Sequence, residues 1–232
     1  LGEDKKRLSK RHAATSLNAY KEMGFTKETI INALALLGWS TENEIFSIDE
    51  LIESFKLENV QKAAAVFDQK RFNWVSSQQL AKLDENGFFE VIKPFMENEN
   101  VNEDYPNYKK ILIAMRTSKT NLKDIAHATR PFFFELDGYD EKGVKKFLNE
   151  SLKTLTFALE VLSKVTEWNE TELDMALIKV RDYFNLPIPK VNQPMRIALV
   201  GSTVSPSLGL TLELFGKEKS LERIQKAIDF IS

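Results

Sequence analysis

"NETELDMALIKVRDYF", residues 169–184, shows most clearly which kind of fold this sequence specifies. Its apolar side chains recur at three- and four-residue spacing: Leu173, Leu177, Val180 and Phe184. That spacing places them on one face of a helix. Asn169 stands where a side chain caps the first turn. The stretch therefore predicts an amphipathic helix whose apolar face packs on a core.

The helical pattern continues along the chain. In "TKETIINALALLGW", residues 26–39, Thr26 is placed to cap a helix. In "SIDELIESFKL", residues 47–57, Ser47 and Glu50 form a capping-box pattern, and a further helix is expected to start at Asp68. No alternating strand pattern runs longer than about four residues. The sequence therefore predicts an all-α or nearly all-α fold.

The composition of the 232 residues limits the classes of protein. A hydrophobic share of 43% and a charged share of 28% predict a globular chain with a buried core. The net charge of −2 means that any nucleic-acid contact must be local. The absence of cysteine and the presence of only two histidines argue against a metal site. No apolar run is long enough to span a membrane, so a cytoplasmic location is expected.

Two polar or proline-rich stretches suggest how the chain is divided. "MENENVNEDYPNY", residues 96–108, predicts an exposed acidic loop, with two parts of the chain meeting near residues 80 to 105. "NLPIPKVNQPMR", residues 185–196, has three prolines and predicts an extended, polyproline-like connector. After it, Ser205 and Pro206 are expected to start one helix and Ser220 the last one.

"KKRLSKRHAATS", residues 5–16, gathers five cations around the hydroxyl of Ser9. Ammonium and guanidinium groups beside a small hydroxyl are suited to hold a polyphosphate. A solvated basic turn near a chain end has the same composition. The residues alone leave both interpretations open.

The order of residues in this loop and in four later blocks adds a resemblance. "RLSKR", residues 7–11, is similar to the signature loop of class I aminoacyl-tRNA synthetases in the form found in glutamyl-tRNA synthetases. The later blocks also resemble that family, in the same order: "RHAATSLNAYKEMGFTKETIINALALLGWS", "EIFSIDELIESFKLENV", "AVFDQKRFNWV" and "QPMRIALVGSTVSPSLGLTLELFGKEKSLERI". The chain therefore resembles the C-terminal portion of a bacterial-type glutamyl-tRNA synthetase, from this loop to its end.

The resemblance implies a domain plan. Residues 1–82 would hold the signature loop and a helical stem-contact domain. Residues 83–232 would form an elongated helical anticodon-binding region, with two subdomains that divide near residue 150. The partners implied are glutamate tRNA and the catalytic N-terminal half of the same enzyme, without a membrane, in a monomer.

The resemblance also implies chemistry: ATP-dependent activation of glutamate with Mg²⁺, then transfer to glutamate tRNA. In the loop, Lys10 would stabilise the transition-state phosphates, with Ser9 as a second catalytic group. Arg7, Leu8 and Arg11 would complete the ATP-binding loop. Arg7 replaces the usual lysine, which spreads the charge over a planar group. The catalytic nucleotide-binding half has no counterpart in these residues, so this chain alone is expected to be inactive and to hold no cofactor tightly.

Anticodon reading is expected from Arg196, because an arginine on a stiff connector contacts an unstacked base at low entropic cost. An ion pair with a surface carboxylate is the alternative. Ser205 and Leu208 are secondary candidates at a helix start, where Ser205 could equally be only an N-cap. By the resemblance, Arg116 also belongs to this set. Ser118 stands where some members have an anticodon-reading arginine, so discrimination at the first anticodon base does not carry over.

A second class of function stays open from the residues alone. A helical scaffold that binds protein partners without catalysis would show the same apolar stripes, with the basic loop incidental. Salt separates the two, because binding through phosphates weakens with ionic strength and apolar docking does not.

Overall fold

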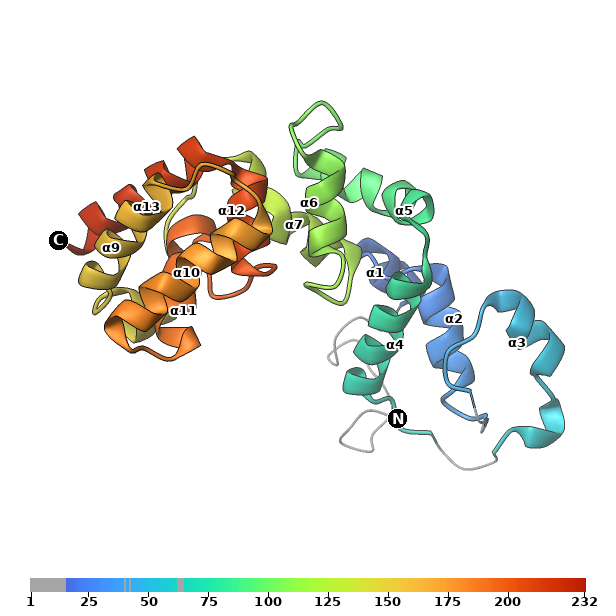
Figure 1. The fold of residues 1–232 in the computed structure, drawn as a ribbon. Helices are drawn as coiled ribbons and strands as arrows, with labels where there is room; N and C mark the ends of the chain where they lie inside the picture. Colours follow the sequence, from blue (N-terminus) through green and yellow to red (C-terminus); the bar gives the residue numbers. More distant parts are fainter. Residues whose placement is uncertain (1–15, 40, 42, 62–64) are drawn as a thin grey trace. The chain divides into compact units, whose positions relative to one another are not determined.

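The fold is known from a computed structural model that describes residues 16–39, 41, 43–61 and 65–232 (Figure 1). Of these described residues, 68% are helical. The described residues contain no strand, and their only isolated bridge pairs Trp39 with Val60. The predicted all-α class is therefore confirmed.

The helices fall into two compact units. The first includes the described residues up to Glu103 and Lys119–Ala128, and the second includes Asp104–Ser118 and Thr129–Ser232. The helices of unit 1 are α1 (Leu17–Glu22), α2 (Lys27–Ala35), α3 (Ile48–Ser54), the 3-10 turn η1 (Leu57–Asn59), α4 (Gln69–Lys82) and α5 (Glu85–Asn98). Unit 2 contains α6 (Tyr108–Met115), α8 (Glu141–Gly143), the π turn η2 (Val144–Leu148), α9 (Leu152–Ser163), α10 (Glu170–Phe184), α11 (Ile188–Val200), α12 (Leu208–Phe215) and α13 (Lys217–Ile231). Helix α7 (Leu122–Phe133) begins in unit 1 and ends in unit 2.

The predicted helix starts of unit 1 are confirmed by their caps. The Thr29 N–H donates to Thr26 Oγ1 at 3.2 Å at the start of α2. In α3 the capping box is complete, because the Glu50 N–H donates to Ser47 Oγ and the Ser47 N–H donates to Glu50 Oε2 at 2.7 Å. Asp68 caps α4 through the N–H groups of its next turn. These local patterns decide where the helices begin.

The prediction of an exposed loop over residues 96–108 is wrong in part. Helix α5 continues to Asn98, and Met96, Val101 and Tyr108 are all buried. The stretch is rich in acidic residues, but three apolar side chains within it are still buried, two in unit 1 and one in unit 2. Their spacing fits neither a helix nor a strand, so periodicity could not reveal them.

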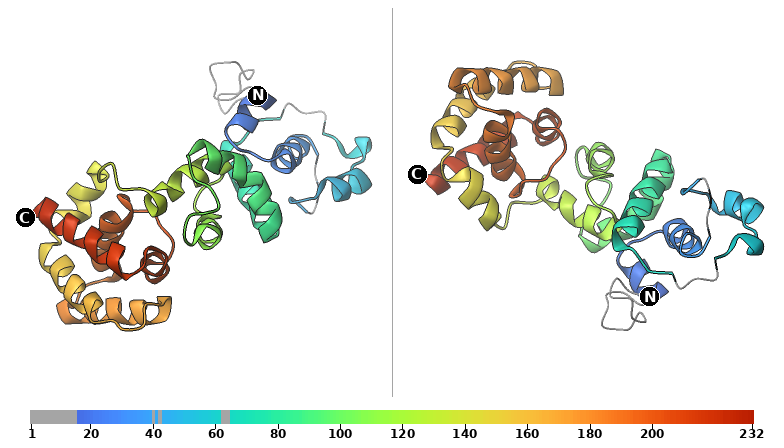
Figure 2. Two further views of the ribbon diagram at one scale, coloured as in Figure 1. Left: turned by 90° about the horizontal axis from the view of Figure 1, so that it is seen from above. Right: turned by 90° about the horizontal axis from the view of Figure 1, so that it is seen from below.

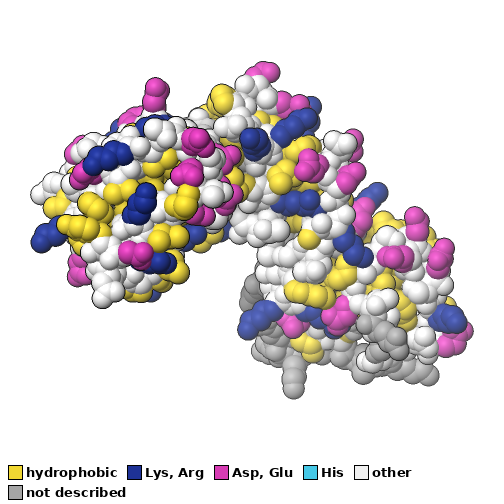
Figure 3. Space-filling model, viewed as in Figure 1, with side chains coloured by type: hydrophobic (Ala, Val, Ile, Leu, Met, Phe, Trp, Pro, Cys, Tyr) yellow, Lys and Arg dark blue, Asp and Glu magenta, His cyan; other side chains and the backbone are white. Residues whose placement is uncertain are grey.

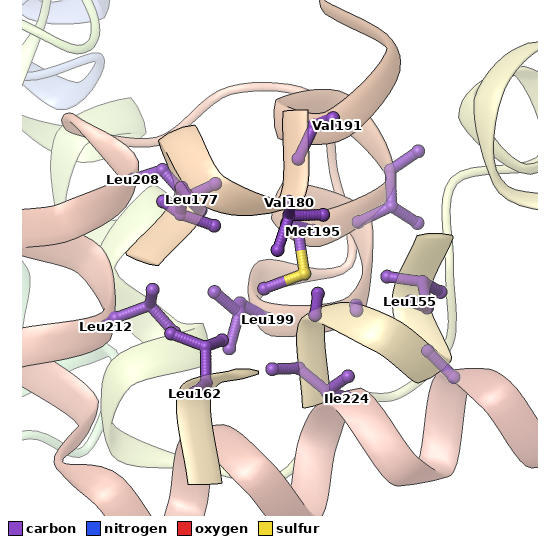
Figure 4. Close-up of a cluster of buried hydrophobic side chains, with 14 of the residues drawn as sticks. Leu155, Leu162, Leu177, Val180, Val191, Met195, Leu199, Leu208, Leu212 and Ile224 are labelled. Carbon is purple, nitrogen blue, oxygen red and sulfur yellow. The ribbon is translucent and has the colours of Figure 1, made fainter. Parts of the chain in front are cut away.

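Unit 2 is built around one aliphatic core, shown in Figure 4. Helices α9 and α13 lie side by side, and α10 packs against both α9 and α12 (Figures 1 and 2). The core includes Leu155, Leu162, Val180, Leu199 and Ile224, each with no exposed surface. The cap predicted at Asn169 is confirmed, since the Glu172 N–H donates to its Oδ1 at 3.0 Å.

The predicted extended connector over residues 185–196 is wrong, because Ile188–Val200 forms helix α11. Two of the three prolines stand at its start: Pro187 is the N-cap, and Pro189 lies in the first turn, where a missing N–H does no harm. Pro194 lies inside the helix and is itself buried. Burial of the α11 face beside it, including Met195 and Leu199, offsets the lost backbone bond.

Two other predicted helix starts are also wrong. The N-cap of α12 is Ser207, whose Oγ accepts from the Leu210 N–H, and not Ser205 with Pro206. Helix α13 begins at Lys217 after Gly216, so Ser220 lies one turn inside it. Ser220 is buried and donates to the Leu212 carbonyl at 3.3 Å. In both places several small polar residues compete for the cap, and the backbone path selects one of them.

A buried arginine joins three segments of unit 2. Arg223 of α13 is only 2% exposed and donates to the carbonyls of Leu199 and Phe134, at the ends of α11 and α7. Its guanidinium lies 4.5 Å from the centre of the Phe215 ring. Burial lowers the pKa of Arg223 to about 10. The arginine thus supplies donors to carbonyls that helix ends leave without partners.

Candidate functional site

The candidate site is the exposed edge of α11 at Arg196, beside the segment that leads into α12. Arg196 is half-buried, and its Nε donates to Ser205 Oγ at 3.1 Å. Its Nη2 donates to the Pro206 carbonyl at 3.2 Å. Among the described residues Arg196 makes no ion pair, which argues against the surface ion pair that the sequence left open.

Hydrogen bonds hold the side chain of Arg196 in place and occupy only part of its donor capacity. A guanidinium carries five N–H donors, and the two bonds to Ser205 and Pro206 occupy two of them. Partial burial lowers the pKa of Arg196 from its ordinary value. Arginine remains charged in proteins, so this position offers a fixed cation with donors to spare.

Ser205 supports Arg196 and has little capacity left for a ligand. Its Oγ accepts from Arg196, donates to the Pro206 carbonyl at 3.0 Å and lies 3.1 Å from Thr211 Oγ1. A serine hydroxyl has one donor and two acceptor positions, which these three neighbours fill. Thr211 itself is fully buried. Ser205 therefore orients the guanidinium, and a direct contact from its hydroxyl to a base would break one of these bonds.

Leu208 occupies the core and not the surface. It is 2% exposed and lies next to Leu177 in the close-up (Figure 4). Leu208 is the first residue of α12, so its burial in the core fixes the end of the Ser205–Ser207 segment that precedes it. Leu208 thus contributes to the site by fixing its backbone.

Arg116 and Ser118 lie on a different element of unit 2 from Arg196. Arg116 is the C-cap of α6, and the Ser118 N–H donates to the Met115 carbonyl at 2.9 Å in the turn that follows. Ser118 Oγ is a buried atom without a hydrogen-bond partner. The structure therefore joins Arg196 with Ser205, and it places Arg116 and Ser118 elsewhere in the unit.

A set of carboxylates surrounds the start of α12, and sequence reasoning missed it. Ser207 donates to Glu170 Oε1, the Gly209 N–H donates to Asp174 Oδ1 at 3.1 Å, and the Glu170 N–H donates to Glu213 Oε2 at 2.7 Å. A Cβ on Gly209 would meet Asp174 Oδ1 at 2.5 Å, so only glycine permits this close approach. The spacing of Glu170 and Asp174 on one helix face was the available signal.

The predicted ATP-binding loop, with Arg7, Leu8, Ser9, Lys10 and Arg11, lies outside the described residues. Within the described ranges no group of three or more histidine or acidic side chains is placed to hold a metal ion. None of the described helices is long and apolar enough to cross a bilayer.

Comparison with known proteins defines the class to which this chain and site belong. Residues 87–228, which include α9–α12 and most of α13, match the family model described as an anticodon binding domain. Residues 1–74 match the model described as the catalytic domain of class I tRNA synthetases (E and Q). The two matches lie on either side of residue 82, where the functional boundary stays a prediction.

Relatives narrow this class to one family. A glutamate–tRNA ligase from Thermodesulfovibrio yellowstonii is 34% identical over 99% of this chain and 51% of its own length. One from Syntrophotalea carbinolica is 36% identical over 98% of the chain and 50% of its own length. The chain belongs to the glutamate–tRNA ligase family, and it spans about half the length of the curated relatives it matches.

Solved structures agree with this assignment. A glutamate tRNA ligase from Elizabethkingia meningosepticum, determined in complex with its amino acid, aligns with a TM-score of 0.76 and 30% identity. The alignment covers 92% of this chain and 43% of the ligase. A glutamate–tRNA synthetase from Elizabethkingia anophelis aligns with a TM-score of 0.73, also at 30% identity, over 90% of this chain and 42% of that protein.

Proposed function

We propose that this chain is the tRNA-binding part of a glutamate–tRNA ligase, and that Arg196 contacts a base of the anticodon. One observation supports this proposal above the others. Arg196 is a cation on the exposed edge of α11, held by Ser205 and Pro206 with three donors left, inside the range that matches an anticodon binding domain. Such a group hydrogen-bonds to or stacks on an unpaired base.

In the same proposal, residues 1–82 contact the tRNA stem and residues 83–232 its anticodon, with Arg116 and Ser118 as further contacts. The whole enzyme would activate glutamate with ATP and Mg²⁺ and transfer it to glutamate tRNA. Lys10 and Ser9 would stabilise the charge that develops on the phosphates, with Arg7, Leu8 and Arg11 completing the loop. These roles rest on the resemblance of the loop to its family. A cytoplasmic monomer is the setting we expect.

Equilibrium binding of the full chain to glutamate tRNA tests the proposal. The chain should bind the cognate transcript more tightly than transcripts with single anticodon substitutions. Affinity should fall roughly tenfold or more between about 50 and 200 mM salt, because two or more phosphates are contacted. Binding that is indifferent to both sequence and salt would favour the alternative of a scaffold for protein partners.

The Arg196→Ala variant locates the discrimination. It should remove the preference for one anticodon base while the other preferences remain. Arg71→Ala is a matched control, because Arg71 is an exposed arginine of unit 1 paired with Glu44 at 2.7 Å. The control should leave every base preference unchanged. An Arg196→Ala variant with all base preferences intact would refute a reading role for Arg196.

A further inference from the structure

A groove of about 240 Å³ lies between α10 and α11, whose helices run side by side in unit 2 (Figure 1). It is lined by Asp174, Leu177, Ile178 and Arg181 from α10 and by Ile188 and Asn192 from α11. Sites for whole small molecules are usually larger, about 300–1,000 Å³. The groove therefore suits a single flat group and not a complete cofactor.

The sides of the groove are apolar and exposed. Ile178 is 44% exposed and Ile188 is 56% exposed, while Leu177 beneath them is buried. Hydrophobic side chains are visible on the surface over α10 and α11, with charges of both signs between them (Figure 3). Two branched side chains facing solvent on neighbouring helices offer an apolar contact to the face of an aromatic ring.

The polar groups of the groove favour a base and disfavour a phosphate. Asn192 carries an amide with two donors and one acceptor group. Asp174 presents a carboxylate, whose Oδ1 already accepts from the Gly209 N–H. The Arg181 guanidinium donates from Nε and Nη2 to Asp182 Oδ1, at 3.1 and 3.0 Å, so its charge is largely balanced. A carboxylate repels phosphate but accepts hydrogen bonds from an exocyclic amine.

The groove and the Arg196 site share helix α11, since Asn192 lines the groove and Arg196 follows it by four residues. Asn192 and Arg196 are four residues apart on α11 and share one face, about 6 Å apart along the helix axis. The segment that holds Arg196 also reaches the groove, since Ser207 donates to Glu170 and the Gly209 N–H donates to Asp174. An RNA strand bound at Arg196 would therefore have the groove within about one helical turn.

We propose that this groove binds an unpaired nucleobase that carries an exocyclic amine, next to the base that Arg196 contacts, and that Asp174 and Asn192 read it together. The inference rests on the proposed function, because the groove is offered to the same RNA. The isoleucines contact the face of the ring, Asn192 pairs with its edge, and the Asp174 carboxylate accepts from the amine. Uracil has no exocyclic amine and binds less well.

The test measures binding of the full chain to the anticodon stem–loop of glutamate tRNA. Each amine-bearing loop base is replaced in turn by uracil, and the set is repeated with Asn192→Ala, Arg196→Ala and Gln225→Ala. Gln225 is an exposed amide on α13 that donates to Asp229, so its variant is the matched control. In the unmodified chain the replacement at the groove base should weaken binding about five-fold or more, and a change at the neighbouring base, which Arg196 contacts, should weaken it as well.

Asn192→Ala should reduce that loss and leave the loss at the neighbouring base, which Arg196→Ala should abolish instead. An Asn192→Ala variant that keeps every base preference, or that weakens all RNAs equally, overturns the inference and leaves the proposed function standing. An Arg196→Ala variant without effect overturns the reading role proposed for Arg196, and binding that is indifferent to both sequence and salt overturns the proposed function itself. Unchanged thermal unfolding of these variants, all at a partly exposed position, excludes a folding defect.

Discussion

One buried cluster of unit 1 differs in its side chains from the main core of unit 2. The cluster around Phe25 in unit 1 is mostly aromatic, with Phe25 and Phe72 meeting edge to face at 4.8 Å between ring centres. In unit 2 the core is almost entirely aliphatic (Figure 4). Aromatic pairs require specific geometry, whereas aliphatic side chains fill space. Unit 2 thus gains a single continuous core on which α11 and Arg196 are fixed.

The buried polar groups of the two units differ in the same way. Unit 1 uses the neutral amide of Asn32, which donates to the Glu44 carbonyl at 2.9 Å and accepts from the Phe46 N–H and from Gln79. Unit 2 uses the charged Arg223 to join helix ends. A charged donor forms stronger hydrogen bonds than a neutral one, but it is more costly to bury. We therefore expect the stability of unit 2 to depend more on Arg223 than the stability of unit 1 depends on Asn32.

The largest effect is expected from Arg223→Met. It leaves the carbonyls of Leu199 and Phe134 without their donor, which should lower the free energy of unfolding of unit 2 by about 2–5 kcal/mol. Denaturant unfolding followed by Trp168 fluorescence measures this, because the other two tryptophans belong to unit 1. Arg223→Lys, with a single ammonium, should be intermediate. Equal or higher stability of Arg223→Met would show that desolvation of the charge outweighs its bonds.

Asn32→Ala tests the corresponding group in unit 1. It removes the acceptor of the buried Phe46 N–H and should lower stability by about 1–3 kcal/mol. Unfolding should be followed by tryptophan fluorescence in a Trp168→Phe background, so that only unit 1 reports. A larger loss than that of Arg223→Met would reverse the ranking of the two units.

Removing an equivalent N-cap from each unit should lower the stability of both units by the same amount. Ser47→Ala in α3 and Asn169→Ala in α10 each delete one hydrogen bond to the third residue of a helix. Each should lower stability by about 1 kcal/mol, because a cap acts locally and does not depend on the core. Helix-resolved hydrogen exchange measures both. A difference of several-fold between the two variants would contradict a purely local effect.

The smallest effects concern pH and have opposite signs in the two units. The hydrogen bond from the Ser47 backbone, then that from its side chain, lowers the pKa of Glu50, so its stabilisation is present above the ordinary glutamate pKa and is lost as pH falls through the lowered one. Burial, and next the charge of Glu170, raises the pKa of Asp174. Its contribution is therefore present below the ordinary aspartate pKa and is lost as pH rises through the raised one.

Glu50→Gln should thus reduce stability at neutral pH and converge with the unmodified chain in acid. Asp174→Asn should do the reverse, with no loss or a slight gain at neutral pH. Thermal unfolding between about pH 3 and 7 compares them, in the range where carboxylates titrate. Parallel curves for the two variants would contradict the opposite shifts.

The sequence was sufficient wherever the signal was local. Thr26, Ser47 and Asn169 were found because a cap and its partner lie within three residues. The all-α class followed from periodicity alone. The family resemblance was carried by ordered blocks and was confirmed by the comparisons.

The sequence was insufficient wherever tertiary contacts overrode a local rule. In the sequence, all three prolines near α11 argue equally against a helix. In the structure two of them stand at the helix start, and the buried face compensates for Pro194. Arg223 lies among lysines and glutamates in the sequence of α13, where no local pattern indicates burial, and only the fold buries it. The stiff connector expected to hold Arg196 is instead helix α11, where Ser205 orients the side chain, and the reading role of Arg196 stays a prediction.

The most direct test of the central proposal is the coupling free energy between Arg196 and one anticodon base. Four dissociation constants are needed: the unmodified chain and Arg196→Ala, each with the cognate glutamate tRNA and with a transcript changed at that base. The account predicts a coupling of about 1 kcal/mol or more at one anticodon position. A coupling indistinguishable from zero at all three positions would contradict it.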